Sequence, residues 1–212
     1  MAPGRARRQW TVAAAACAAA VVGGASQHAL AQAATGAARA QEIVGGKCFI
    51  CHGADGESSS PAFPRLAGQH SGYVARQLAD YKSGRRKSSA MQPMVDDLAE
   101  ADFKLLGAYF ESRPVHAHKV EDAELAAMGR FIYNRGNPYS GVAACAGCHG
   151  PQGHGTEALP RLAGQHAAYT ENQLKQFGKR ERTNDSAVMQ AVAAKLTELE
   201  MKAVAAYISG LK

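Results

Sequence analysis

The sequence predicts an all-α protein built from two tandem domains of the same kind. Three observations support this prediction. The segment Pro64–His70 returns letter for letter as Pro160–His166, 96 residues later. Apolar residues near the end of each copy recur at the spacing of one helix face, and no stretch shows the sustained alternation that predicts a strand. Two long units indicate a tandem duplication of one domain rather than a solenoid.

The boundary between the copies falls in the polar stretch Ser112–Lys119. Pro114 lies within this stretch and disfavours continuation of the preceding helix. The repeat offset rises from 96 to 98 towards the C-terminus, as small length changes in loops would produce. We therefore expect one domain over residues 32–118 and a second over residues 119–212.

Each copy is expected to contain three main helices. Thr197 and Glu200 form a capping-box pattern at the start of the last one. Each half is small for an independent apolar core, so we expect a large flat cofactor to complete it. The expected elements are about Ala38–Lys47, Ser71–Lys82 and a helix carrying Phe103, Leu106 and Phe110, then Met128–Tyr133, Ala167–Phe177 and a helix carrying Val204, Tyr207, Ile208 and Leu211.

Residues 1–31 predict an export signal that is absent from the mature protein. A basic start leads into an apolar, alanine-rich run from Trp10 to Val22, and Ala29-Leu30-Ala31 fits the pattern that a signal peptidase cleaves. The run is too short for a membrane anchor, which needs about 20 residues. Twin-arginine export and lipid modification of Cys17 are weaker alternatives, since the surrounding residues do not favour them. We expect cleavage near Ala31.

The charge of the remaining chain excludes a nucleic-acid-binding function. It carries 21 basic and 18 acidic residues, a net charge of +3. The excess is spread over both copies, whereas nucleic-acid recognition needs a concentrated basic stripe.

Two C-x-x-C-H motifs contain all four cysteines that remain after cleavage. Two cysteines three residues apart share a helix face and can each bond a haem vinyl group, while the adjacent histidine reaches the iron. A zinc ribbon would need its cysteine pairs 15–20 residues apart, roughly, rather than 97. A thioredoxin-like pair would need neither the histidine nor a second copy. The motifs predict two covalent haem c groups, attached at Cys48, Cys51 and His52 and at Cys145, Cys148 and His149.

The repeat also predicts the sixth iron ligand of each haem. Met91 lies 39 residues after His52, and Met189 lies 40 residues after His149. Met94 is an alternative sixth ligand in the first copy, but the residue at the matching position of the second copy is Val192, so the repeat favours Met91. Methionines are more often core residues than ligands, and we assign Met128 and Met201 to the core because neither has a methionine twin.

His/Met ligation fills both axial positions of the iron, which predicts an electron carrier rather than an enzyme. A two-haem peroxidase would need one iron without a stable sixth ligand. The twin residues His70 and His166 are alternative ligands, or else helix-start residues near the haem edge. Three histidines without twins are expected at the surface: His116, His118 and His154.

These motifs together resemble the cytochrome c4 family, over residues from about Gln41 to Lys212. The resemblance rests on two C-x-x-C-H motifs, each followed by Pro-Arg-Leu-Ala-Gly-Gln, a Tyr…Gln-Leu helix and a late methionine. It implies two class I cytochrome c domains that face each other about a pseudo-twofold axis, with haem propionates near the interface. It also implies a periplasmic protein that passes electrons from a cytochrome bc-type donor towards a terminal oxidase, in loose association with the membrane.

The resemblance also implies roles for residues around the haems. The carbonyl groups of Pro64 and Pro160 would accept a hydrogen bond from the proximal histidines, and such a bond orients the ring. Arg65 and Arg161 would face propionates, unless they are ordinary surface arginines. The first helix of copy one departs from the family, because it lacks a glycine-then-aromatic pattern and carries Gly45-Gly46 just before the motif.

A second function remains open from the sequence. Closely similar two-haem chains serve as electron-accepting subunits docked on a dehydrogenase, such as a flavocytochrome sulfide oxidiser. Sequence alone separates this function poorly from that of a free carrier.

Overall fold

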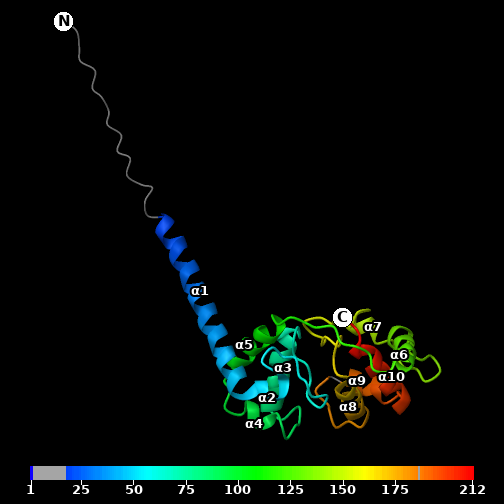
Figure 1. The fold of residues 1–212 in the computed structure, drawn as a ribbon. Helices are drawn as coiled ribbons and strands as arrows, with labels where there is room; N and C mark the ends of the chain where they lie inside the picture. The colour runs from blue at the N-terminus through cyan, green and yellow to red at the C-terminus, as the bar shows by residue number, and fades with distance from the viewer. Residues whose placement is uncertain (2–17, 186) are drawn as a thin grey trace. The chain divides into compact units, whose positions relative to one another are not determined.

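The computed structural model describes residues 1, 18–185 and 187–212 (Figure 1). It divides into two units, Met1–Ala38 and Arg39–Lys212, which are described separately. Residues 2–17, which hold much of the expected export signal and Cys17, lie outside the described part. In the ranges that are described, no helix is long and apolar enough to span a bilayer.

The regular secondary structure of the described residues is helical, as expected, and these residues contain no β-strand, only one isolated bridge between Asn137 and Val142. Helix α1 (Ala18–Ile43) accounts for the described helical part of the first unit, and its last residues belong to the second unit. The second unit continues with η1 (Val44–Cys48), α2 (Phe49–His52), α3 (Ser71–Lys82), α4 (Gln92–Val95), α5 (Glu100–Glu111), α6 (Ala123–Arg135), α7 (Ala146–His149), α8 (Ala167–Gly178), α9 (Val188–Ala193) and α10 (Glu198–Ser209).

Each copy of the repeat builds its own apolar core. In the first copy α5 packs against α3, and in the second copy α10 packs against both α6 and α8. The two clusters share no residue, which is the arrangement expected for two tandem domains. The first cluster contains Ile43, Val44, Val74, Val95, Leu98, Phe103, Leu106 and Phe110, and the second contains Ile132, Tyr133, Val142, Leu174, Phe177, Ala193, Leu196, Met201, Val204 and Ile208.

The approach to the first C-x-x-C-H motif differs from the expected single helix. The α-helical part ends at Ile43, and residues Val44–Cys48 form one π-helical turn. Within it, the Phe49 N–H donates to the Val44 carbonyl oxygen, five residues back. The two glycines of this turn make no close contact at the position of a Cβ atom. The turn joins α1 directly to the motif, whereas copy two uses a loop between α6 and α7.

The aromatic residue of the expected glycine-then-aromatic pattern in copy two, Phe131, is 61% exposed, and in both copies the buried pair is a small residue followed four positions later by a larger one. Gly129 and Tyr133 occupy these positions on α6, whereas Ala40 lies near the end of α1 and Val44 begins η1, and both larger side chains are buried. At Gly129 the helices are in backbone contact, since a Cβ atom there would lie only 1.9 Å from the Ala203 carbonyl oxygen of α10. Only glycine permits this approach.

The N-termini of α5 and α10 are capped unequally. On α10, Thr197 accepts from the Glu200 N–H, and the Glu200 carboxylate accepts from the Thr197 N–H. This confirms the predicted capping box. On α5, Asp102 accepts from the Ala99 N–H at 3.0 Å, but Ala99 has no side-chain oxygen to return the bond.

Two sequence-based placements were wrong. Met201 is buried as expected, but Met128 is 43% exposed because it lies on the face of α6 that points away from α10. His118 is not a free surface residue, since its imidazole Nε2 lies 3.2 Å from the Glu57 carboxylate and is shielded from solvent.

Candidate haem sites and the contact between the two halves

The first motif places its cysteines and histidine on one short helical segment. Cys48 ends the π-helical turn, and Cys51 and His52 follow on α2, so that the sequence spacing becomes a common helix face. His52 is buried, and its Nδ1–H donates to the Pro64 carbonyl oxygen at 2.9 Å. Because a carbonyl can only accept, this bond fixes the tautomer and leaves the lone pair on Nε2.

The second motif repeats the arrangement. Cys145 is the N-cap residue of α7, which carries Cys148 and His149. The His149 Nδ1–H donates to the Pro160 carbonyl oxygen at 3.1 Å. None of these four cysteines forms a disulfide with another cysteine of the described ranges.

Burial controls the protonation of both motifs. It lowers the pKa of His52 and of His149, and the proline carbonyl in each case partly offsets this effect. Both imidazoles are therefore neutral near pH 7, the form that binds a metal. Burial also raises the pKa of the Cys48 thiol and raises that of Cys145 to about 11.

The paired methionines lie beside the same cores as the cysteines. Met91 is partly buried and packs with Cys48 against the first cluster, and Met189 packs with Cys145 against the second. The rival Met94 is 38% exposed and does not belong to the cluster. Each predicted methionine thus lies against the same apolar cluster as the first cysteine of its own motif.

The twin histidines contact the opposite half. His70 and His166 are the N-cap residues of α3 and α8, as the helix-start interpretation expected. The Nε2 of His70 bonds to the His154 carbonyl oxygen at 2.7 Å, and that of His166 bonds to the Ser58 carbonyl oxygen at 2.8 Å.

Two glutamines of the repeated segment join the halves reciprocally. The Gln69 side chain donates to the Arg161 carbonyl oxygen at 2.9 Å and accepts from the Arg161 N–H at 2.8 Å. Gln165 makes the equivalent pair of bonds to the backbone of Arg65, both at 2.9 Å. Such an exchange of identical contacts is what a pseudo-twofold axis produces.

A buried polar network continues this contact, and the sequence alone did not reveal it. The guanidinium groups of Arg86 and Arg182 each donate to both Gln77 and Gln173. Arg86 also donates to the Tyr169 hydroxyl, and Arg182 to that of its twin Tyr73, each at 3.0 Å. The repeat offset of 96 relates every residue of this network to another member, which is the signal that could have exposed it.

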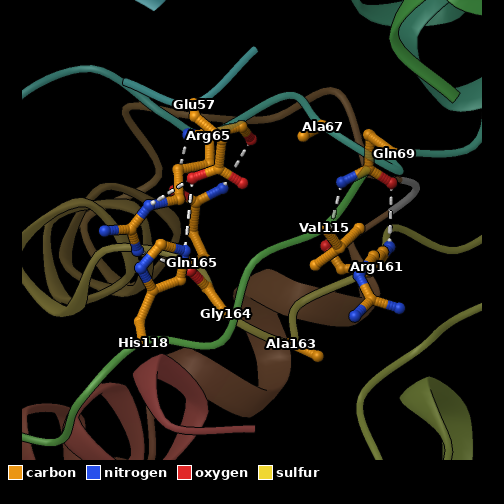
Figure 2. Close-up of a pocket in the computed structure, with 10 residues that line it drawn as sticks. All are labelled: Glu57, Arg65, Ala67, Gln69, Val115, His118, Arg161, Ala163, Gly164 and Gln165. Atoms are coloured by element: carbon orange, nitrogen blue, oxygen red, sulfur yellow. Dashed lines mark hydrogen bonds and ion pairs between the residues drawn. The ribbon is translucent and has the colours of Figure 1, made fainter. Parts of the chain in front are cut away.

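The two arginines of the repeated segment lie in a small pocket at the contact (Figure 2). The Nε atoms of Arg65 and Arg161 are buried without a hydrogen-bond acceptor among the described residues. Arg65 has Glu57 at 3.3 Å, poorly aligned, whereas Arg161 has no carboxylate partner in that part of the chain. Burial lowers the pKa of Arg161, as expected for a cation without a counter-charge.

These orphaned donors fit a haem c group. A buried guanidinium N–H that lacks an acceptor is costly, and a carboxylate that arrives there relieves the cost. Haem c carries two propionates, and the neighbouring histidines are already oriented for iron. The chemistry of the donor set therefore agrees with the cofactor that the cysteine motifs predict.

The comparison with known proteins agrees with this geometry. The sequence profile of the cytochrome c family matches residues 37–136 and 134–212, which makes the chain a two-domain c-type cytochrome. Cytochrome c4 of Thiocapsa roseopersicina is 42% identical over 170 residues, which cover 78% of this chain and 88% of the relative. The crystal structure of reduced recombinant cytochrome c4 from Pseudomonas stutzeri superposes with a TM-score of 0.79 at 40% identity, and covers 83% of this chain and 98% of that one.

The chain belongs to the cytochrome c4 family. It binds two covalent haem c groups and is an electron carrier rather than an enzyme. A thiosulfate dehydrogenase electron acceptor of Stutzerimonas stutzeri (strain A1501) is also similar, at 36% identity over 169 residues, which cover 77% of this chain and 78% of the relative.

Proposed function

We propose that this protein is an exported two-haem carrier in which each half holds one closed, His/Met-ligated iron. His52 and Met91 would ligate the first iron, and His149 and Met189 the second. The thioether links would form at Cys48 and Cys51 and at Cys145 and Cys148. The halves would correspond to residues 32–118 and 119–212.

The hydrogen bonds of the two proximal histidines, His52 and His149, support this ligand assignment most directly. Both proximal histidines are buried, and each donates Nδ1–H to the proline carbonyl of the repeated segment, at 2.9 and 3.1 Å. This bond orients the ring, leaves Nε2 as the ligand atom and tunes the metal. When bound, haem c supplies a one-electron couple whose potential a methionine ligand raises.

The protein residues have three tasks in this function. Met91 and Met189 would each supply the second protein ligand of an iron, which would leave no open site there for oxygen or peroxide. Arg65 and Arg161 would accept the propionates as hydrogen-bond and charge partners. The glutamine bonds between the halves hold both sites in one fixed unit, so that an electron can be stored or relayed without a large structural change.

Replacement of each methionine tests the ligand assignment. In the oxidised holoprotein, Met91→Ala and Met189→Ala should each remove about half of the weak long-wavelength absorption that a sulfur–iron bond produces. The reduction potential of the affected haem should fall. Met94→Ala serves as the matched control and should change neither. The assignment is wrong if Met94→Ala has the larger effect or if both ligand variants retain the full absorption.

The cell location and partners follow from the same proposal. We expect cleavage near Ala31, export to the periplasm and loose association with the membrane surface. The donor would be a cytochrome bc-type complex and the acceptor a terminal oxidase. N-terminal sequencing of the mature protein from a periplasmic fraction tests the cleavage site directly.

A second candidate function is that of an electron-accepting subunit for a dehydrogenase. The similarity to a thiosulfate dehydrogenase electron acceptor favours it, although identity to the cytochrome c4 relatives is higher. Stopped-flow reduction separates the two functions. A carrier should be reduced rapidly by a quinol-driven cytochrome bc-type complex, whereas a dedicated subunit should be reduced only by its dehydrogenase, with which it should copurify.

A further inference from the structure

Three potential metal ligands from both halves meet at one edge of the contact. His70 is the N-cap residue of α3, Glu111 is the last residue of α5, and Glu157 lies in the loop before α8. One ligand atom from each lies within 4.8 Å of the other two. No other group of three such side chains occurs in the chain where the structure describes it.

The imidazole of His70 is already oriented for a metal. Its Nε2 bonds to the His154 carbonyl oxygen at 2.7 Å, so Nε2 carries the proton and Nδ1 carries the lone pair. Nδ1 faces the Glu111 carboxylate at 3.7 Å, too far for a hydrogen bond. A carbonyl bonded to the outer nitrogen is the usual companion of a metal-binding histidine. The side chains of His70 and Glu111 are 24% and 40% exposed, which leaves access from solvent.

The third ligand is held in place by bonds between the halves. The Gly72 N–H donates to the Glu157 carboxylate at 3.3 Å, and Arg76 donates to the Ala158 carbonyl oxygen at 2.8 Å. These bonds fix the loop of the second half against the start of α3. Two carboxylates therefore converge on one imidazole, and no lysine or arginine of the described residues lies at ion-pair distance from either of them.

We propose that His70, Glu111 and Glu157 bind one divalent transition-metal ion of the zinc type, with water completing the coordination. One nitrogen and two carboxylate oxygens form a ligand set that suits Zn²⁺, whereas Ca²⁺ and Mg²⁺ prefer oxygen alone. The ion would link the two halves, because its ligands come from both.

The opposite edge of the contact lacks this site. His166 repeats the bond of His70 to a carbonyl of the other half, but Ser209 stands where the repeat places the counterpart of Glu111. The chain should therefore bind one such ion rather than two.

Calorimetric titration of zinc chloride into the oxidised two-haem protein tests the proposal. We expect one site per chain, and Glu111→Gln should weaken it at least about 10-fold, as loss of a metal-site group does. Glu100→Gln is the matched control, since it removes the same charge from the other end of α5. His166→Ala controls for the imidazole at the opposite edge. Both controls should keep the wild-type affinity, and the haem spectrum should stay constant in all four proteins.

Thermal unfolding provides a second measurement. Zinc should raise the unfolding temperature of the wild type and of Glu100→Gln but not that of Glu111→Gln, and a chelator should reverse the shift. The proposal is overturned if the wild type binds no zinc, if Glu111→Gln binds as tightly as the wild type, or if Glu100→Gln loses affinity equally. His70 and Glu157 would then serve only as hydrogen-bonding groups at the contact, and Glu111 only as a nearby charge.

Discussion

Replacement of Gln69 by alanine should destabilise the contact between the two halves and lower the free energy of unfolding. The change removes both bonds to the Arg161 backbone and leaves that N–H and carbonyl without partners. Each lost bond is worth about 1 kcal/mol, and a stranded buried group costs about 1–3 kcal/mol. Because Arg161 is only partly buried, the expected loss is about 2–4 kcal/mol, or roughly 4–15 °C in unfolding temperature for a chain of this size.

The repeat supplies the controls for this experiment. Gln165→Ala removes the equivalent bonds to Arg65 and should produce a loss of the same size. Gln41 is exposed, so Gln41→Ala should change stability by less than about 0.5 kcal/mol. Thermal unfolding is followed by circular dichroism, with the haem absorbance as a check on cofactor content. The reasoning fails if Gln69→Ala and Gln165→Ala shift the transition no more than Gln41→Ala does.

Three further predictions concern the helices. Gly129→Ala should destabilise the second half by about 3 kcal/mol in denaturant unfolding, because the new Cβ would overlap the Ala203 backbone; an unchanged midpoint would contradict the close approach. Thr197→Ala should cost about 1 kcal/mol of unfolding free energy, while Ala99→Thr should gain a similar amount by completing the cap of α5; calorimetry that shows the same sign for both would refute this. Hydrogen bonding from the Thr197 N–H lowers the pKa of Glu200 in the folded protein. The ionised Glu200 therefore contributes its full stabilisation of the folded state above the ordinary glutamate pKa of about 4.3, and this contribution is lost as the pH falls through the lower folded-state pKa. Glu200→Gln should therefore flatten the acid limb of stability below about pH 4 in urea titrations, and an unaltered limb would contradict this assignment.

The sequence predicted the middle helix of each copy well because its local signals were strong, whereas the first helices, α1 and α6, begin well before the expected Ala38 and Met128. The expected bounds of α3, Ser71–Lys82, are those observed, and α8 extends only one residue beyond the expected Phe177. The internal repeat supplied most of the evidence, since a helix expected in one copy could be compared with the matching segment of the other. It also favours Met91 over Met94 as an iron ligand, which stays a prediction; Met91 is partly buried against the first cluster.

The features that were missed depend on contacts between distant segments. The π-helical turn Val44–Cys48 has no periodic signature, because it is too short to show one. Met128 and His118 were misplaced because their exposure depends on which helix or loop covers them. The shared network of Arg86 and Arg182 forms only when the halves meet, so no local pattern in either half could reveal it, and only the repeat offset that relates its members pointed to it.

The matching bonds of Gln69 to the Arg161 backbone and of Gln165 to the Arg65 backbone make the contact between the halves isologous, with the same surface used on both sides as in a homodimer. A chain with a single copy would carry a face complementary to itself. In this protein the stretch Ser112–Lys119 tethers two such faces, which replaces a concentration-dependent association by an intramolecular one. The tether also allows the two copies to differ from each other, as Glu111 differs from its counterpart Ser209. Joining the two copies in one chain thus replaces a symmetric dimer by a single molecule whose two halves need not be identical.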